Sequence, residues 1–211
     1  MKLVLRCLWM VVLTSLLTAC GSLLPSPPPT PSFYTLGRTE KTAPLEEAVQ
    51  TTGPVLLVNP MRAASGYDST HMIYTQRPQQ IEQFARNEWV DTPARMLASW
   101  LVQVLSSELT RSALVGAVLL APSSAVIEYV LDADLIQLQQ DFGVQPSQVR
   151  LTLRVALIQT KTRRVMAVRE FDATEPAKTD DPRGGAQAAQ TAVARVLLEV
   201  AEFCKLALQV K

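Results

Sequence analysis

Three long runs in which apolar and polar residues alternate, between positions 126 and 174, constrain the fold of this chain most. The run "VIEYVLDADL" places Tyr129 and Leu131 on one face and Asp132 and Asp134 on the other, as a half-buried strand requires. The run "QVRLTLRVAL" and residues 165–174 repeat the pattern, and a short turn joins them. Long neighbouring strands with short turns favour an antiparallel meander.

The alternation slips at one point of the first run. Ile136 and Leu138 put apolar side chains on the face that is otherwise polar. A β-bulge, or a sheet covered on both sides, explains such a slip. The alternative is an exposed apolar patch that serves oligomerisation or the docking of a partner. The sequence leaves both explanations open.

Two amphipathic helices accompany these strands. The first is predicted to begin at Pro93, after Asp91 or Thr92 as its cap, and to end near residues 111–112. The second is predicted over about residues 186–210, after a break at residues 183–185. Its apolar residues recur at helical spacing and form one stripe: Val193, Val196, Leu197, Val200, Cys204 and Leu208.

Shorter extended runs complete the element order. They are predicted at residues 33–36, 55–58, 71–76 and 80–86 before the first helix, and at 115–120 after it. The runs at 71–76 and 80–86 are separated by a turn and resemble the arms of a hairpin. The order of strands and helices predicts a single α+β domain, with a mostly antiparallel sheet and two amphipathic helices packed on one face.

The first 19 residues have the pattern of an export signal. Lys2 and Arg6 supply positive charge, and residues 7–19 are uncharged and mostly apolar, which is too short for the roughly 20 residues of a membrane-spanning helix. The stretch "LTAC" that ends at Cys20 resembles the bacterial lipobox, in which the cysteine receives a diacylglycerol. We therefore predict that residues 1–19 are removed and that a lipid on Cys20 anchors the mature protein to a membrane.

The residues after Cys20 indicate which membrane holds the protein and how the folded domain is connected to it. Gly21 stands where an inner-membrane retention signal has aspartate, so we expect the periplasmic face of the outer membrane. Residues 20–32 are expected to hold the lipidated cysteine and a proline-rich tether, since "GSLLPSPPPTPS" favours an extended polyproline chain. The folded domain is then expected over residues 33–211.

Composition argues against several function classes. The chain has 20 basic and 19 acidic residues, and without Lys2 and Arg6 of the expected export signal no positive excess is left for binding a nucleic acid. The chain has one histidine, His71, and no nucleotide-binding glycine pattern or metal-spaced cysteines. Asp132 and Asp134 share a strand face, but alternating outward carboxylates are typical of a solvated surface. Cys204 is expected to be a buried hydrophobic residue. We expect no catalytic residue, no metal and no cofactor.

The stretches beyond the tether resemble the ABC-type transport auxiliary lipoprotein family. The resemblance rests on "FYTL" at 33–36, on Tyr74 followed by Arg77, and on residues 84–89 leading to Pro93. The loop at residues 59–72 departs from the family, and Phe84 stands where the family often has tyrosine. The resemblance implies a non-catalytic accessory of mammalian-cell-entry (MCE) type lipid transport systems. Its partners would be an MCE-type protein and separate ABC permease and ATPase subunits, and a homo-oligomer stays open.

Five residues are candidates for contacts with a ligand or partner: Tyr34, Tyr74, Trp89, Ile136 and Leu138. The aromatic residues lie near strand ends and the helix start, where packing is the alternative. Two other functions remain open from the sequence. One is a lipoprotein that assembles or stabilises the envelope without a transporter, and the other is an anchored periplasmic hydrolase that uses His71.

Overall fold

The computed structural model describes residues 30–37 and 53–209 of the chain. From Pro31 onward they belong to one compact unit. Cys20, the predicted export signal and nearly all of the predicted proline-rich tether lie outside the described residues. The described elements, in chain order, are β1 (Ser32–Tyr34), β2 (Val55–Val58), β3 (Arg62–Ala63), β4 (His71–Thr75), β5 (Glu82–Trp89), α2 (Pro93–Arg111), β6 (Ala117–Leu120), β7 (Tyr129–Asp141), β8 (Gln148–Gln159), β9 (Arg164–Pro176) and α3 (Pro182–Gln209).

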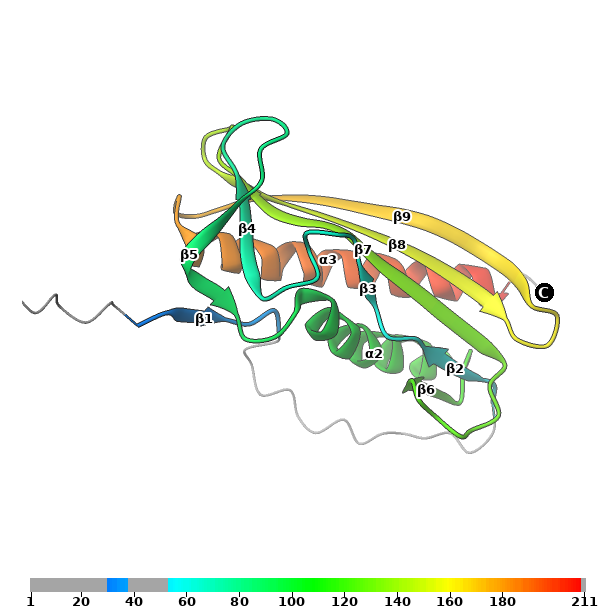
Figure 1. Cartoon of the computed structure of the whole chain (residues 1–211). Coiled ribbons are helices and arrows are strands. Elements are labelled where there is room, and N and C mark those ends of the chain that lie inside the picture. Colours follow the sequence, from blue (N-terminus) through cyan, green and yellow to red (C-terminus); the bar gives the residue numbers. More distant parts are fainter. Residues whose placement is uncertain (1–29, 38–52, 210–211) are drawn as a thin grey trace, which may run out of the picture. The chain divides into compact units, whose positions relative to one another are not determined.

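The predicted antiparallel meander is confirmed and forms one side of the sheet, with β9 at the edge and the shorter strands beyond β7 (Figure 1). β8 pairs with β7 on one side and with β9 on the other, both antiparallel. Alternate residues on β7 and β8, such as Leu131, Leu135 and Leu153, are fully buried. The period of two in the sequence therefore marks the face of the sheet that packs into the core.

The shorter strands make the sheet mixed. β4 and β5 form the expected antiparallel hairpin. β2 pairs in parallel with both β6 and β7, β1 pairs in parallel with β5, and β3 and β4 run parallel to β7. A parallel pair needs a crossover connection, and α2 lies in the connection between β2 and β6. The two-residue strand β3 was not expected from the sequence.

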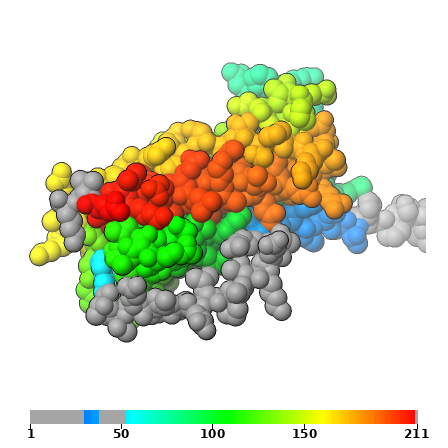
Figure 2. All heavy atoms as spheres, turned by 180° about the vertical axis from the view of Figure 1, so that it is seen from behind, coloured from blue at the N-terminus to red at the C-terminus, as the bar shows by residue number. Residues whose placement is uncertain are grey.

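Both helices cover one face of the sheet (Figure 1), as predicted. α3 packs against β8, β9 and α2, and Figure 2 shows it lying along β9 and beside α2. The expected apolar stripe of α3 is buried, with Val196, Val200 and Cys204 fully inaccessible. Burial raises the pKa of the Cys204 thiol to about 12, so the thiol stays protonated and serves as a packing residue.

The start of α3 differs from the sequence-based expectation. The helix begins at Pro182, so Gly184 and Gly185 lie in its first turns instead of breaking the chain before it. Asp181 accepts a hydrogen bond from the Gly184 amide at 2.7 Å, which holds the pKa of its carboxyl below the usual range. A Cβ at Gly185 would overlap the carboxamide of Gln140. The glycines are needed for close packing, and sequence alone presents them as helix breakers.

The slip in β7 is a β-bulge. The pairing of β7 with β8 shifts register between Leu135 and Gln137, which restores the alternation on the far side of the bulge. Leu138 consequently returns to the core face and is only 4% exposed, while Ile136 is half-buried. Leu138 therefore cannot belong to an exposed docking patch, and this correction follows from the extra residue that the bulge inserts.

An ion pair connects the two helices. Lys205 Nζ of α3 lies 2.8 Å from Glu108 Oε2 of α2, and both side chains are only about a quarter exposed. The hydrogen bond from Lys205 lowers the pKa of Glu108. A lowered carboxyl pKa stabilises the fold above the unfolded-state value of about 4.3, and this stabilisation is lost as the pH falls below it.

We expect Lys205→Met to lower the free energy of unfolding at pH 7 by up to about 1 kcal/mol, the upper range for a solvent-accessible pair. The difference from the parent chain should shrink as Glu108 becomes protonated in acid. Urea denaturation at pH 7 and at acidic pH measures this, with Lys178→Met, an exposed lysine, as the control. An equal loss of stability at both pH values would mean that packing of the lysine stem is responsible.

Candidate functional site

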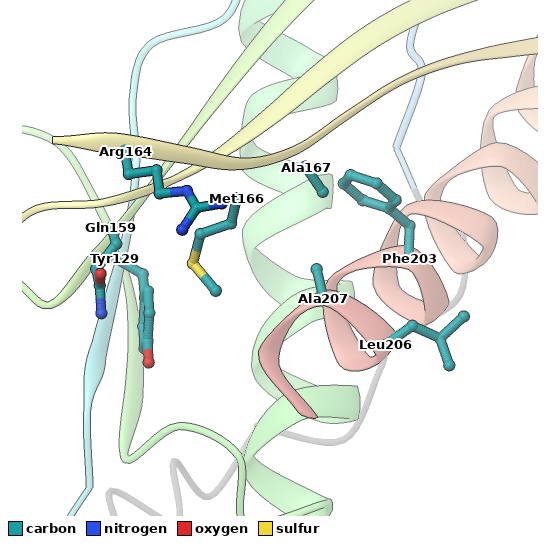
Figure 3. A pocket seen from close by; sticks show the side chains of 8 residues that line it. All are labelled: Tyr129, Gln159, Arg164, Met166, Ala167, Phe203, Leu206 and Ala207. Carbon is teal, nitrogen blue, oxygen red and sulfur yellow. The ribbon is translucent and has the colours of Figure 1, made fainter. Parts of the chain in front are cut away.

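A groove with a volume of about 800 Å³ lies where the meander meets the end of α3 (Figure 3). We call it the β9–α3 groove. The strands contribute one wall and the last turns of α3 the other. Its lining residues are Tyr129 of β7, Gln159 of β8, Arg164, Met166 and Ala167 of β9, and Phe203, Leu206 and Ala207 of α3.

A second bulge shapes the strand wall of this groove. Ala167 pairs with Leu157, and Val165 pairs with Ile158, so Met166 is the extra residue of β9 at this point. A bulge redirects the side chain that it inserts and commonly lies near functional sites. Figure 3 shows Met166 pointing from β9 into the space before α3, between Tyr129 and Ala207.

The groove is apolar over most of its surface. Met166, Phe203 and Ala207 are half-buried, and Leu206 is 57% exposed. Among the described lining residues Arg164 is the one with a charge, and its guanidinium forms no ion pair within the described parts of the chain. The groove thus combines apolar walls with a single positive charge at its strand end.

A second surface feature lies where the β4–β5 and β7–β8 loops project from the sheet (Figure 1). The Tyr74 and Phe84 rings have centroids 4.4 Å apart, and Phe142 lies edge-on to Tyr74 at 5.7 Å. Ile81 on the β4–β5 loop and Val144 on the β7–β8 loop are 55% and 41% exposed. We call these five residues the aromatic tip. The Tyr74 hydroxyl donates to Glu82 Oε2 at 2.7 Å, and this bond raises the tyrosine pKa.

The predicted contact residues do not form one site. Tyr74 belongs to the aromatic tip, whereas Tyr34 is half-buried on β1 and donates its hydroxyl to Asn87 Oδ1 at 3.3 Å. Trp89 is only 5% exposed and packs in the core. Ile136 and Leu138 lie at the β7 bulge described above. Cys20, the predicted point of lipid attachment, is outside the described residues.

The polar residues that could suggest catalysis are engaged elsewhere or isolated. Asp132 accepts a hydrogen bond from Asn59 at 2.7 Å, and Asp134 pairs with Arg62 at 2.7 Å. These contacts bind the β2–β3 segment to β7. His71 is exposed at the start of β4. Across residues 30–37 and 53–209, no group of acidic, histidine and cysteine side chains is arranged to hold a metal ion.

The folded domain matches the family model of the ABC-type transport auxiliary lipoprotein component over residues 34–201. The chain belongs to this family. The matched range runs from Tyr34, the last residue of β1, to Ala201 within α3, and it includes α2 and the strands β2 to β9 completely. It confirms the family resemblance seen in the sequence, and it makes this chain a lipoprotein associated with ABC-type transport.

Solved structures have the same fold as this auxiliary lipoprotein. Protein XCC0632 from Xanthomonas campestris has 21% identity and a TM-score of 0.68, with 83% of this chain and 95% of that chain covered. An uncharacterized protein has 16% identity and a TM-score of 0.65, with 83% and 99% covered. At these identities the likeness concerns the fold alone. No curated protein matches the chain in sequence.

Two further findings concern the membrane and the groove. In the described ranges of the auxiliary lipoprotein, no helix has the length and apolar character needed to cross a membrane.

The β9–α3 groove was not predicted from the sequence, because no residue pattern marks the bulge at Met166. One signal was present: Leu206 is an apolar residue on the outer face of an otherwise amphipathic helix.

Proposed function

We propose that this auxiliary lipoprotein is a non-catalytic, lipid-anchored accessory of an MCE-type ABC transporter that moves lipid or another hydrophobic solute between membranes. The observation that carries the proposal is the match of the family model over nearly the whole folded domain. The apolar β9–α3 groove and the isolation of His71 are consistent with handling an apolar molecule without catalysis.

The sequence supports the proposed arrangement in the envelope. Residues 1–19 serve as the signal peptide, and a lipid on Cys20 anchors the chain to the periplasmic face of the outer membrane. Residues 20–32 form the tether, which in a polyproline conformation of about 3.1 Å per residue spans roughly 35 Å. The domain over residues 33–211 then reaches toward an MCE-type protein and, through it, the permease and ATPase subunits.

The aromatic tip is our proposed contact surface for the MCE-type protein. Aromatic residues are enriched in the centres of protein interfaces, and apolar neighbours such as Ile81 extend the buried area. The tip lies at the ends of β4, β5 and β7, where two loops project from the sheet (Figure 1), and Phe142 N donates to Thr75 O at 2.8 Å. Because a backbone hydrogen bond and ring contacts already order the tip, it can bind a partner with little loss of conformational freedom.

Mild crosslinking of cells that make the tagged full-length protein, followed by purification and mass spectrometry, tests this function. We expect an MCE-type protein in the eluate that is missing from a control with an unrelated lipoprotein. Ile81→Glu should lower its recovery about tenfold, because a charge at an interface centre must be desolvated. Val126→Glu, at an 82% exposed site on the β6–β7 loop, should leave recovery unchanged.

Two outcomes would contradict the proposal. Recovery of outer-membrane components alone would favour the envelope-assembly lipoprotein. Equal recovery with Ile81→Glu and Val126→Glu would remove the aromatic tip as the contact surface while leaving the partnership itself in place.

A further inference from the structure

We propose that the β9–α3 groove binds one acyl chain of an anionic phospholipid and that Arg164 binds the phosphate of that lipid. The inference rests on the proposed function, since it names the molecule that the accessory handles. It concerns residues of this chain that no sequence motif marks.

The groove has the size and lining of a small-molecule site. Its volume of about 800 Å³ lies within the range of roughly 300–1,000 Å³ that is usual for such sites. The apolar part runs from Met166 on the strand side to Phe203 and Leu206 on the helix side (Figure 3). The methylene groups of an acyl chain placed between these side chains are removed from water. This transfer favours binding in proportion to the apolar area that is buried.

The polar residues of the groove are gathered at one end by the strand register. Tyr129 pairs with Gln159 across β7 and β8, and Gln159 pairs with Arg164 across β8 and β9. The three side chains therefore form a short polar row across three strand ends, and the apolar lining begins beside it. An apolar channel with polar groups at one end matches an amphiphile, whose head group and chain are likewise separated.

The polar row has donors available for an anion. Within the described residues, the Tyr129 hydroxyl and the Arg164 guanidinium have no hydrogen-bond partner, and Gln159 uses its carbonyl oxygen to accept from Thr162 at 2.8 Å. Arginine presents a planar fork of N–H donors that fits two oxygens of a phosphate. No acidic residue lines the described groove, so nothing on its walls competes for Arg164.

The surrounding charge also favours an anionic lipid. The turn from β8 to β9 carries Lys161 and Arg163 next to Arg164, all exposed and without an ion pair in the described parts of the chain. A second copy of the chain fits this site less well, because its groove would bring another unpaired Arg164 and no carboxylate from the lining. An anionic phospholipid supplies both the missing negative charge and the apolar chain.

Binding of a fluorescent-chain phosphatidylglycerol to the mature chain tests the inference. The chain carries Cys20→Ala, so that no attached lipid competes, and diacylglycerol with the same fluorescent chain serves as the probe without phosphate. We expect saturable binding that is about tenfold tighter for phosphatidylglycerol, the gain typical of a charge-assisted phosphate contact. Arg164→Gln should abolish this preference, whereas Arg163→Gln, one residue away and outside the lining, should retain it.

A pair of leucines on α3 tests the apolar part. Leu206 and Leu198 are 57% and 56% exposed on the same helix, but only Leu206 lines the groove. Leu206→Glu should weaken binding of both probes about tenfold or more, and Leu198→Glu should not. Circular dichroism of each variant checks that the fold is retained.

Three results would overturn the inference: no saturable binding, equal effects of Leu206→Glu and Leu198→Glu, or equal effects of Arg164→Gln and Arg163→Gln. The last would mean that the basic turn attracts anionic lipid surfaces without a specific groove. Each result is separable from the proposed function, because copurification of an MCE-type protein does not require a lipid in this groove.

Discussion

Cys20→Ala is expected to release the mature protein from the membrane while its domain stays folded. In the proposed arrangement, acyl chains on Cys20 anchor the protein, and each CH₂ buried in the bilayer contributes about 0.8 kcal/mol, so that more than one chain makes binding nearly permanent. The described domain offers no membrane-crossing helix to replace them. Fractionation of the envelope, with a salt wash, measures the shift of the protein to the soluble fraction.

Two further variants make the Cys20 experiment decisive. Cys7→Ala changes another cysteine of the export signal and should leave the protein in the membrane fraction. An uncleaved signal could itself hold Cys20→Ala in the inner membrane, so a second variant replaces residues 1–20 with a signal peptide that has an ordinary cleavage site. Firm membrane attachment of that cleaved variant, after the salt wash, would refute anchoring through Cys20.

Gly184→Ala is expected to destabilise the domain by about 2 kcal/mol, within the usual cost of overpacking. Exchange of glycine for alanine inside a helix normally stabilises by up to about 1 kcal/mol, so the expected sign is reversed. A Cβ at Gly184 would overlap the carbonyl of Thr179. The backbone must then move in the loop before α3, where Asp181 accepts the 2.7 Å hydrogen bond from the Gly184 amide.

Urea denaturation of Gly184→Ala and of a matched substitution measures this effect. Gln187→Ala places alanine at an exposed position of the same helix and should change the stability by no more than about 0.5 kcal/mol. Gly184→Ala that is as stable as the parent chain would show that the Thr179 loop can relax without loss. The assignment of Gly184 to close packing would then be wrong.

The sequence predicted the elements better than their pairing. Strand periodicity located β7, β8 and β9, and the Asp91 to Pro93 signal located the start of α2. The parallel pairing of β2 with β6 and β7 was not predicted, because a short apolar run such as 55–58 carries no information on its neighbours. Pairing is set by contacts between distant segments, which local patterns do not encode.

The candidate sites were predicted only in part. Tyr74 was selected as an aromatic residue near a strand end, and it does lie in the aromatic tip. Trp89 was selected on the same ground and Leu138 because it breaks the strand alternation, and both are buried. For Leu138 the reason is the bulge in β7, which moves the side chain to the opposite face, and sequence periodicity locates a slip without saying which way the following residues turn.

By itself the sequence determined the α+β class, the strand meander, the two amphipathic helices and the family of this lipoprotein, since each rests on local periodicity or on a short motif. Only the tertiary structure decided where an apolar groove opens on the surface. The β9–α3 groove exists because a bulge turns Met166 toward α3 and because strand register aligns Tyr129, Gln159 and Arg164. Both depend on residues far apart in the chain meeting in space, so packing and not local pattern fixes the site.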